Sequence, residues 1–354
     1  MLTSITTDDP AWGECLRTLR HDLYHLPAYC RLEARRRGMS ARAFLFRDGE
    51  RVFFVPYLLR RCDDILAELG PGVFDISSPY GYPGPLISDA ARAAAGFVEA
   101  AIEAIHAELV DQHIASAYLR LHPILNQGLD AIGRNACIAQ HGETVSIDLT
   151  LSEAQLWSHT RRGHQSSINR CRRLGVEVEF HPLPGHLASL IDVYRETMNR
   201  VAADAGYDFD DAYFAGLAAL GPAVEVGIAQ VGGQPASACI FFECCGIVQA
   251  HLGGTMDAFL EQSPFMLILD EARRRYRARG NQYLHLGSGY KGQTGDAIFR
   301  FKSGFSRQRF ELSGLCLIGD PALHDRLTLA RAQALGVPVD ELQRAGFFPA
   351  YRAG

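Results

Sequence analysis

The sequence lacks any long apolar run, since none of its stretches approaches the ~18 to 20 residues that a membrane-spanning helix needs. Its first ten residues, which include Asp8 and Asp9, also lack the cationic and apolar regions of a secretory signal peptide. We therefore expect a cytoplasmic protein with no membrane insertion. The chain has 354 residues, 47% of them apolar and 21% charged, which is enough to bury sizeable cores and suggests two domains.

Metal-binding patterns are also missing. The nine cysteines are odd in number and never spaced as CxxC, and the thirteen histidines form no HxH or HExxH pair. We therefore expect no structural metal and no disulfide framework. The cysteines are interpreted as reduced, mostly buried small side chains.

Lysine is the scarcest charged residue. Only two of the 35 basic residues are lysines, Lys291 and Lys302, and they lie eleven positions apart. A lysine ammonium approaches a phosphate or an oxyanion as a compact point charge and changes its protonation state when desolvated, whereas arginine does neither. The local sequence favours a chemical role for this pair over chance clustering.

Basic residues are concentrated in two stretches of a chain whose net charge is −5. Residues 158–175 hold five arginines and no acid, and residues 271–310 hold eight arginines and two lysines against two acids. A cationic surface concentrates phosphates near it, so the pattern suggests a polyanionic ligand. Arginine-rich helix faces that are merely solvated are the alternative.

Periodicity and turn signals predict a mixed α/β chain. In the first half we expect helices over 11–37 and 90–112, a hairpin of 43–46 and 51–59 around Asp48-Gly49, and a strand over 115–121. In the second half we expect helices over 153–174, 186–203, 210–220 and 264–279, and strands over 176–180, 224–231, 236–243 and 246–252. Residues 281–318 should add a strand, a glycine-rich segment, a short helix and a final strand, before a helical tail.

Helix signals are clearest at 264–279, with Ser263 as N-cap, Pro264 in the first turn and Gly280 after the end. A rigid loop at 75–86 combines three prolines and two glycines around Tyr80 and Tyr82. It either presents these tyrosines to a ligand or packs them at an edge.

Several motifs resemble those of a known family. Residues 161–178 are similar to the basic "R...INR.RR.GV.V" helix of the Fem family of aminoacyl-tRNA-dependent transferases. Residues 283–289 (YLHLGSG) and 299–305 (FRFKSGF) resemble that family's strand, glycine turn and Phe-Lys motif. The loop 78–86 and residues 120–123 (RLHP) are similar to FemAB-like proteins, and the order of elements in the second half resembles the GNAT acyltransferase fold.

This resemblance covers most of residues 10–318 and implies an α/β fold with two GNAT-like domains packed around a central cleft. The N-terminal domain, 1–150, would lie on the acceptor side, and the C-terminal domain, 151–320, on the acyl-donor side, followed by a helical tail over 321–354. It also implies transfer of an activated acyl group to an amine without a bound cofactor. The co-substrate is then aminoacyl-tRNA or, alternatively, acyl-CoA.

The loop at 253–263 helps to distinguish an aminoacyl-tRNA donor from an acyl-CoA donor. A CoA-using GNAT cradles pyrophosphate on bare amides of a glycine-rich loop at a helix N-terminus. Here the initial glycine pair is followed by bulky Met256, Phe259 and Leu260 and by the acids Asp257 and Glu261. The sequence therefore favours aminoacyl-tRNA over CoA.

Candidate site residues follow from these motifs. Lys302 is our first choice for the charge that stabilises the transition state. His285, His251 and Asp296 are candidates for accepting the proton of the incoming amine, and Glu243 is a further acceptor. The remaining predicted contacts are Tyr80, Tyr82, Arg120, His122, Ser288, Tyr290 and Lys291 for substrate, and Arg161, Arg162, Arg170, Arg172 and Arg173 for the tRNA backbone.

The acceptor is less clearly indicated. Peptidoglycan ligases of the family often carry a helical arm of alternating charge in the second domain, and this chain has no such segment. The sequence thus favours a natural product or another small amine over a peptidoglycan precursor. A non-catalytic RNA- or protein-binding module is the remaining alternative.

Overall fold

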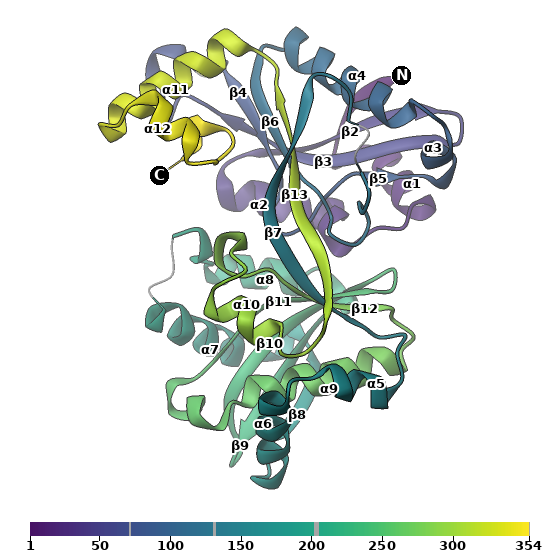
Figure 1. Cartoon of the computed structure of the whole chain (residues 1–354), viewed down its shortest axis with the longest axis vertical. Helices are drawn as coiled ribbons and strands as arrows, with labels where there is room; N and C mark the ends of the chain where they lie inside the picture. Colours follow the sequence, from purple (N-terminus) through teal and green to yellow (C-terminus); the bar gives the residue numbers. More distant parts are fainter. Residues whose placement is uncertain (71, 130–131, 202–204, 354) are drawn as a thin grey trace. The chain divides into compact units, whose positions relative to one another are not determined.

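The computed structural model describes residues 1–70, 72–129, 132–201 and 205–353 and divides the chain into two compact units (Figure 1). Unit 1 combines Met1–His141 with the residues from Glu311 onward, and unit 2 is Gly142–Phe310. We expected boundaries at 150 and 320 and a separate tail, whereas the structure returns the chain to unit 1 after Phe310. None of the described helices has the length and apolar character needed to cross a bilayer.

The sheet of unit 1 has the order β1-β2-β3-β4-β6-β13, with short β5 beside β3. Neighbouring strands are antiparallel except β4 and β6, which run parallel and are joined through a helical crossover. The strands are β1 (Leu2–Thr6), β2 (Ser40–Asp48), β3 (Arg51–Arg61), β4 (Phe74–Ser77), β5 (Leu86–Ile87), β6 (Ile114–Arg120) and β13 (Gln308–Ile318).

The sheet of unit 2 repeats this pattern in the order β8-β9-β10-β11-β12-β7. Its fourth and fifth strands, β11 and β12, form the parallel pair, and the other described pairs are antiparallel. The strands are β7 (Ala136–Asp148), β8 (Glu177–Pro182), β9 (Val224–Val231), β10 (Gln234–Cys244), β11 (Ile247–Thr255) and β12 (Tyr283–Gly287).

The last strand of each sheet comes from the other half of the sequence. β7 follows the first six strands in the chain but completes the sheet of unit 2, and β13 ends the second half but pairs with β6 of unit 1. Neither β1 nor most of β7 was predicted from the sequence. This exchange explains why the domain boundaries fall within β7 and β13 rather than after them.

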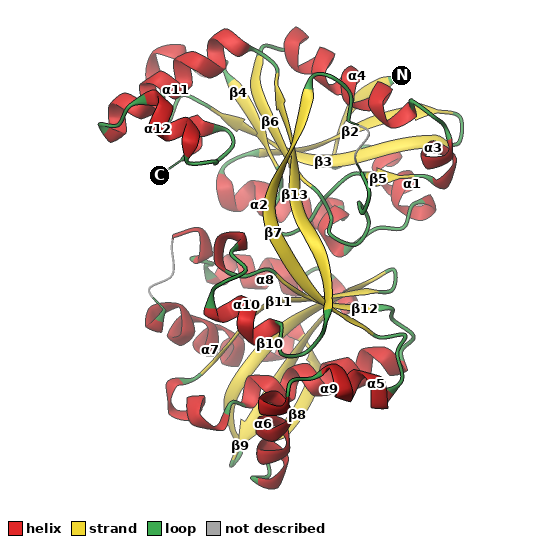
Figure 2. Cartoon of the chain, in the orientation of Figure 1, coloured by secondary structure: helices red, strands yellow, loops and turns green. Residues whose placement is uncertain are grey.

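Helices surround the strands of both units (Figure 2). Unit 1 contains α1 (Pro10–Thr18), α2 (Pro27–Arg37), α3 (Asp89–Ala93), α4 (Phe97–Asp111), α11 (Pro321–Leu335) and α12 (Val339–Arg344). Unit 2 contains α5 (Glu153–His159), α6 (Arg162–Arg173), α7 (Leu187–Arg200), α8 (Asp211–Ala218), α9 (Pro264–Ala278) and α10 (Ala297–Lys302).

Two predicted helices are each broken in the structure. The helix expected over 11–37 divides because Asp22 caps a short 3-10 turn at 23–25 and Pro27 starts α2. The helix expected over 153–174 divides at Thr160. At 264–279 the helix is confirmed, but Ser263 has a left-handed conformation (φ 58°) and its side chain makes no capping hydrogen bond.

One hydrophobic core of unit 2 lies on the face of its sheet where α5, α6, α9 and α10 pack, and α7 covers the other face against buried Ile240 and Phe242. It includes Phe241 of β10, Ile268 and Tyr276 of α9, Ile168 of α6 and Phe299 of α10. Because side chains alternate along a strand, the neighbours of these core residues point to the opposite face. On that opposite face lie the buried polar side chains of Ser146, Gln249 and His285.

Candidate functional site

Lys302 is the last residue of α10, and its position is set by a short strand-to-helix segment. Its Nζ donates a hydrogen bond to the carbonyl oxygen of Ser288 at 2.7 Å, just after β12. Burial lowers the pKa of Lys302 from 10.5 to about 8, although the nearby Asp296 carboxylate and Cys239 thiol act in the opposite direction. The amine is therefore poised close to neutrality and is still mostly protonated at pH 7.

Asp296 organises the glycine turn rather than facing a substrate. One carboxylate oxygen accepts the N–H of Phe299 at 2.5 Å and so caps α10, and the other accepts the N–H of Tyr290. Gly289 is required here, because a Cβ at that position would lie 2.6 Å from the Asp296 carboxylate. The predicted role of Asp296 as a base is thus replaced by a structural one that positions Lys302.

Strands β11 and β12 part close to Lys302. Their described pairing covers only Ile247–Gln249 against Tyr283–His285, while β11 continues to Thr255. Lys302 contacts the chain directly after β12, and its charge acts on the thiol of Cys239, which pairs with Gly253 of β11. The amine therefore lies where the two strands diverge.

A row of polar side chains crosses the sheet at the end of the paired region. Strand register places His285 of β12 between Ser146 of β7 and Gln249 of β11, and all three are buried. Nδ1 of His285 lies 2.6 Å from Oε1 of Gln249. Since an amide oxygen can only accept, Nδ1 carries the proton and Nε2 carries the lone pair.

Ser146 is the member of this row that our sequence analysis missed. Its hydroxyl is buried and makes no hydrogen bond to the described residues. A buried hydroxyl without a partner is costly, and such groups in a native structure call for an explanation. The signal could not be found in the sequence, because it depends on the pairing of β7 with β12 across more than a hundred residues.

His251 lies further along β11 at an irregularity. Two residues of β11, His251 and Leu252, stand opposite Ile240 of β10, which marks a β-bulge. The ring of His251 stacks on Phe242 at 4.2 Å and is half-buried, in contrast to the fully buried His285. Of the two predicted histidines, His251 has the larger exposed fraction, although its Nε2 is buried. Glu243 is held by Asn281 at 2.5 Å and by Arg279 at 2.5 Å.

Helix α6 presents arginines to solvent and anchors its other side to the Lys302 helix. Buried His164, Ile168 and Cys171 form the inner stripe, and Nε2 of His164 lies 2.8 Å from the carbonyl oxygen of Phe301. The arginines predicted for tRNA are exposed: Arg161, Arg162, Arg170, Arg172 and Arg173. The buried side of α6 therefore contacts α10, while its arginines face solvent.

The five arginines differ in their partners. Arg172 forms ion pairs of 2.6 Å with both Asp270 and Glu271 of α9, and this balances its charge. Arg161 hydrogen-bonds to the chain around α10 through its backbone and guanidinium. The structure therefore gives Arg172 a role in fixing α6 to α9, and leaves Arg162 and Arg173 as the better candidates for contacting phosphates.

The segment before α9 is closed by its own hydrogen bonds. Residues Asp257–Gln262 form a 3-10 helix, in which the N–H groups of Phe259 and Ser263 bind carbonyl oxygens within the segment. The N–H of Asp257 binds the Glu196 carboxylate, and Pro264 at the start of α9 has no N–H. This segment therefore lacks the set of unengaged backbone N–H groups that would bind a pyrophosphate.

In unit 1 the structure brings three of the predicted acceptor-side residues together. Arg120, at the end of β6, donates to the carbonyl oxygen of Gly81 at 3.2 Å, between Tyr80 and Tyr82 in the rigid loop. Burial alone would lower its pKa, but neighbouring tyrosines, Tyr118 first and then Tyr82, raise it. Nε of Arg120 is buried and makes no hydrogen bond to the described residues.

The ring of His122 lies 6.4 Å from that of Tyr82, at the edge of this group, but both of its nitrogens bind other residues. It is buried, and its Nε2 lies 2.9 Å from a carboxylate oxygen of Asp22, which is also buried. Its Nδ1 accepts the N–H groups of Ile124 and Leu125 at 3.1 Å. Both ring nitrogens are thus engaged in holding the loop after β6, which replaces the predicted contact with an acceptor.

The remaining predicted contacts lie in the glycine turn after β12. The hydroxyl of Ser288 donates to the carbonyl oxygen of Gly289, and the ring of Tyr290 lies 6.0 Å from that of Tyr207. The backbone of Lys291 belongs to a 3-10 turn, but its side chain is outside the described part of the structure.

Comparison with known families supports this arrangement of unit 2. Residues 158–303 match the acetyltransferase (GNAT) domain family. These residues contain α6, the loop before α9, both diverging strands and Lys302. A search of curated protein sequences finds no match.

Solved structures extend the likeness to both units. The crystal structure of FemX is 10% identical in sequence, with a TM-score of 0.68 over 91% of this chain and 98% of that one. The C-terminal domain of a putative lysylphosphatidylglycerol synthetase from Agrobacterium fabrum is 13% identical, with a TM-score of 0.56 over 92% of this chain and 96% of that one. At such identities the likeness concerns the fold, and the predicted fold is confirmed. The chain thus has the Fem-like tandem-GNAT fold, and the match of its second unit supports a GNAT-fold acyltransferase.

Proposed function

We propose that this protein transfers an amino acid from aminoacyl-tRNA to an amine acceptor and forms an amide bond. The observation that carries the proposal is the contrast between two surfaces of unit 2. The segment before α9 is closed by internal hydrogen bonds and carries Asp257, Glu261 and the bound carboxylate of Glu196. Helix α6, by contrast, exposes Arg162 and Arg173, which suit the phosphates of a tRNA.

The chemistry asked of the protein is modest, because an aminoacyl ester is already activated. The amine attacks the ester carbonyl, the bond to the tRNA ribose oxygen breaks, and the proton that the amine loses passes through a base to that oxygen. Lys302 supplies a positioned ammonium for the oxyanion. His251 accepts the proton from the amine, and the row of Ser146, His285 and Gln249 holds the acceptor by hydrogen bonds.

For the acceptor we propose a small amine, or alternatively a hydroxyl compound, such as a natural-product precursor. Arg120 with Tyr80 and Tyr82 supports recognition of an acidic or polar group on that molecule. The absence of a charged helical-arm segment in the sequence favours this class over a peptidoglycan precursor. We place the reaction in the cytoplasm, where charged tRNA is available.

An acyl-CoA donor is the second candidate. It is favoured by the match of residues 158–303 to the acetyltransferase (GNAT) domain family. The divergence of β11 and β12 would also suit a thioester arm entering between the strands. The closed segment before α9 argues against it, because pyrophosphate would lack its usual amide donors.

Salt dependence of tRNA binding tests the proposal. Loss of each phosphate contact should lower the slope of log affinity against log salt by about 0.7 to 0.9, so Arg162→Ala with Arg173→Ala should flatten it. Arg326→Ala, at an exposed position on α11 of unit 1, is the matched control and should leave the slope unchanged. An equal slope in the wild type and the α6 variant would show that the arginines of α6 do not contact tRNA phosphates.

A further inference from the structure

Two adjacent cysteines form the tip of the hairpin between β10 and β11. Cys244 is the last residue of β10, and it pairs with Ile247 across a two-residue turn of Cys245 and Gly246. Cys245 is exposed and Cys244 half-buried, whereas six of the other cysteines are buried. Most cysteines are thus buried, as expected, and the pair at this tip is an exception.

The turn conformation is unusual for cysteine. Cys245 has φ 46° and Gly246 has φ 79°, the left-handed pair of a type I′ turn, which asparagine, aspartate or glycine normally supplies. The preceding hairpin of the same sheet makes a turn of this kind with Gly232 and Gly233, at φ 58° and 78°. A non-glycine residue with positive φ is strained, and such strain tends to mark a functional position.

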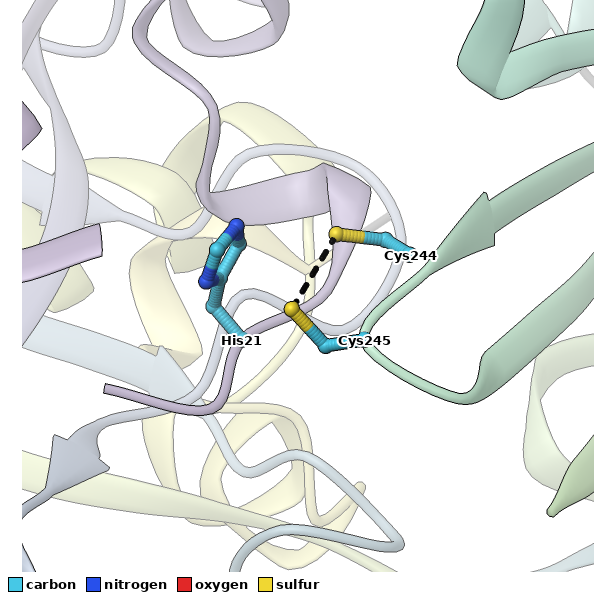
Figure 3. A group of neighbouring side chains, drawn as sticks. All are labelled: His21, Cys244 and Cys245. Carbon is cyan, nitrogen blue, oxygen red and sulfur yellow. Dashed lines mark hydrogen bonds between the residues drawn. The ribbon is translucent and has the colours of Figure 1, made fainter. Parts of the chain in front are cut away.

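The consequence of this turn is that both thiols lie on the same side (Figure 3). The Sγ atoms of Cys244 and Cys245 are 3.9 Å apart. Two thiolates on one tetrahedral zinc, each at about 2.3 Å, are separated by about 3.8 Å. A disulfide, in contrast, requires an S–S distance of about 2.0 Å. The observed spacing thus suits two ligands of one metal ion.

We propose that Cys244 and Cys245 form an exchangeable binding site for a soft, thiophilic divalent cation of the Zn²⁺ or Cd²⁺ class. Thiolates select such ions over Mg²⁺ and Ca²⁺, which prefer oxygen ligands. Binding exchanges the two thiol protons for two metal–sulfur bonds, with no change of oxidation state. The site is separate from the proposed transfer chemistry and is not a structural metal centre.

Cadmium titration tests this site directly. Purified, reduced and chelator-treated protein is titrated with Cd²⁺ while the ultraviolet charge-transfer absorption of cadmium–thiolate bonds is recorded, and Zn²⁺ is then added as competitor. We expect one Cd²⁺ per chain, displacement by Zn²⁺, and release of about two protons per ion bound.

Variants assign the ligands. Even partners outside the ligand shell change metal affinity by about 10- to 100-fold, so Cys244→Ser or Cys245→Ser should weaken Cd²⁺ binding at least as much. Cys137→Ser is the matched control, because Cys137 is exposed and contacts another thiol, that of Cys316. Circular dichroism shows whether each variant folds. Binding that survives Cys245→Ser, is lost in Cys137→Ser, or never appears in folded wild-type protein would overturn the proposal.

Discussion

Replacing Lys302 by methionine should lower the rate of transfer strongly while leaving the free energy of unfolding almost unchanged at pH 7. The loss of one positioned charge typically costs about 10²- to 10³-fold in rate, and we expect that loss here. At pH 7, burial of the charged amine, whose pKa is about 8 instead of 10.5, opposes folding by about 3 kcal/mol. The substitution also removes the hydrogen bond to the Ser288 carbonyl, and this loss destabilises the variant by about 1 to 3 kcal/mol. The variant should therefore be about as stable as the wild type at pH 7, or slightly more so.

The stability of the wild type should also depend on pH, because folding changes the pKa of Lys302. The unfolded chain keeps the Lys302 proton up to about pH 10.5, and the folded chain releases it near pH 8. The wild type should therefore gain up to about 3 kcal/mol relative to Lys302→Met as the pH rises between these values. Below pH 8 Lys302 is protonated in both the folded and the unfolded chain, so the wild type has no such gain.

The assay pairs turnover with chemical unfolding of the wild type, Lys302→Met and Lys302→Arg. Arginine keeps the charge, but its longer planar fork cannot occupy the position of the ammonium, so its rate should fall nearly as far. Full activity in Lys302→Arg would show that charge alone matters. A Lys302→Met chain that is strongly destabilised at pH 7 would show instead that Lys302 is a structural residue.

Two further predictions concern the supports of the site. Burial, followed by the charge of His122, lowers the pKa of His25 to about 4, so the unfolding free energy should fall by up to about 3 kcal/mol between pH 6.5 and pH 4. A urea-denaturation series should show this fall in the wild type and not in His25→Gln, and identical pH profiles would contradict it. Gly304→Ala would place a Cβ 2.2 Å from the His164 ring, so it should lower the melting temperature and the activity by displacing α6 from α10. Gly295→Ala, which has open space around it, should change neither, and equal effects of the two substitutions would remove the steric argument.

Local signals in the sequence predicted much of unit 2. Gly232-Gly233 forms the expected turn, and Pro264 and Gly280 bound α9, because these features depend on the conformation of single residues. The scarcity of lysine singled out Lys302, which the structure places in a half-buried position with a lowered pKa. That prediction rested on composition together with the local sequence and the resemblance of residues 299–305 to a Phe-Lys motif.

The site features that were not predicted depend on contacts between residues far apart in the sequence. Ser146 joins His285 only through the register of β7 with β12, and no local pattern reveals that register. Asp296 and Arg172 were assigned by residue type, but the backbone N–H groups and acids that engage them are set by tertiary contacts. Element periodicity thus indicated the class of fold, while the exchange of β7 and β13 between units stayed hidden.

Parallel titrations of one protein sample decide whether the donor is aminoacyl-tRNA or acyl-CoA. Acetyl-CoA and a charged bacterial tRNA pool are added separately at a stated salt concentration, and each is then used to compete with the other. We predict saturable, salt-sensitive binding of aminoacyl-tRNA that acetyl-CoA does not displace. Tight, competable binding of acetyl-CoA with indifference to tRNA would contradict the account.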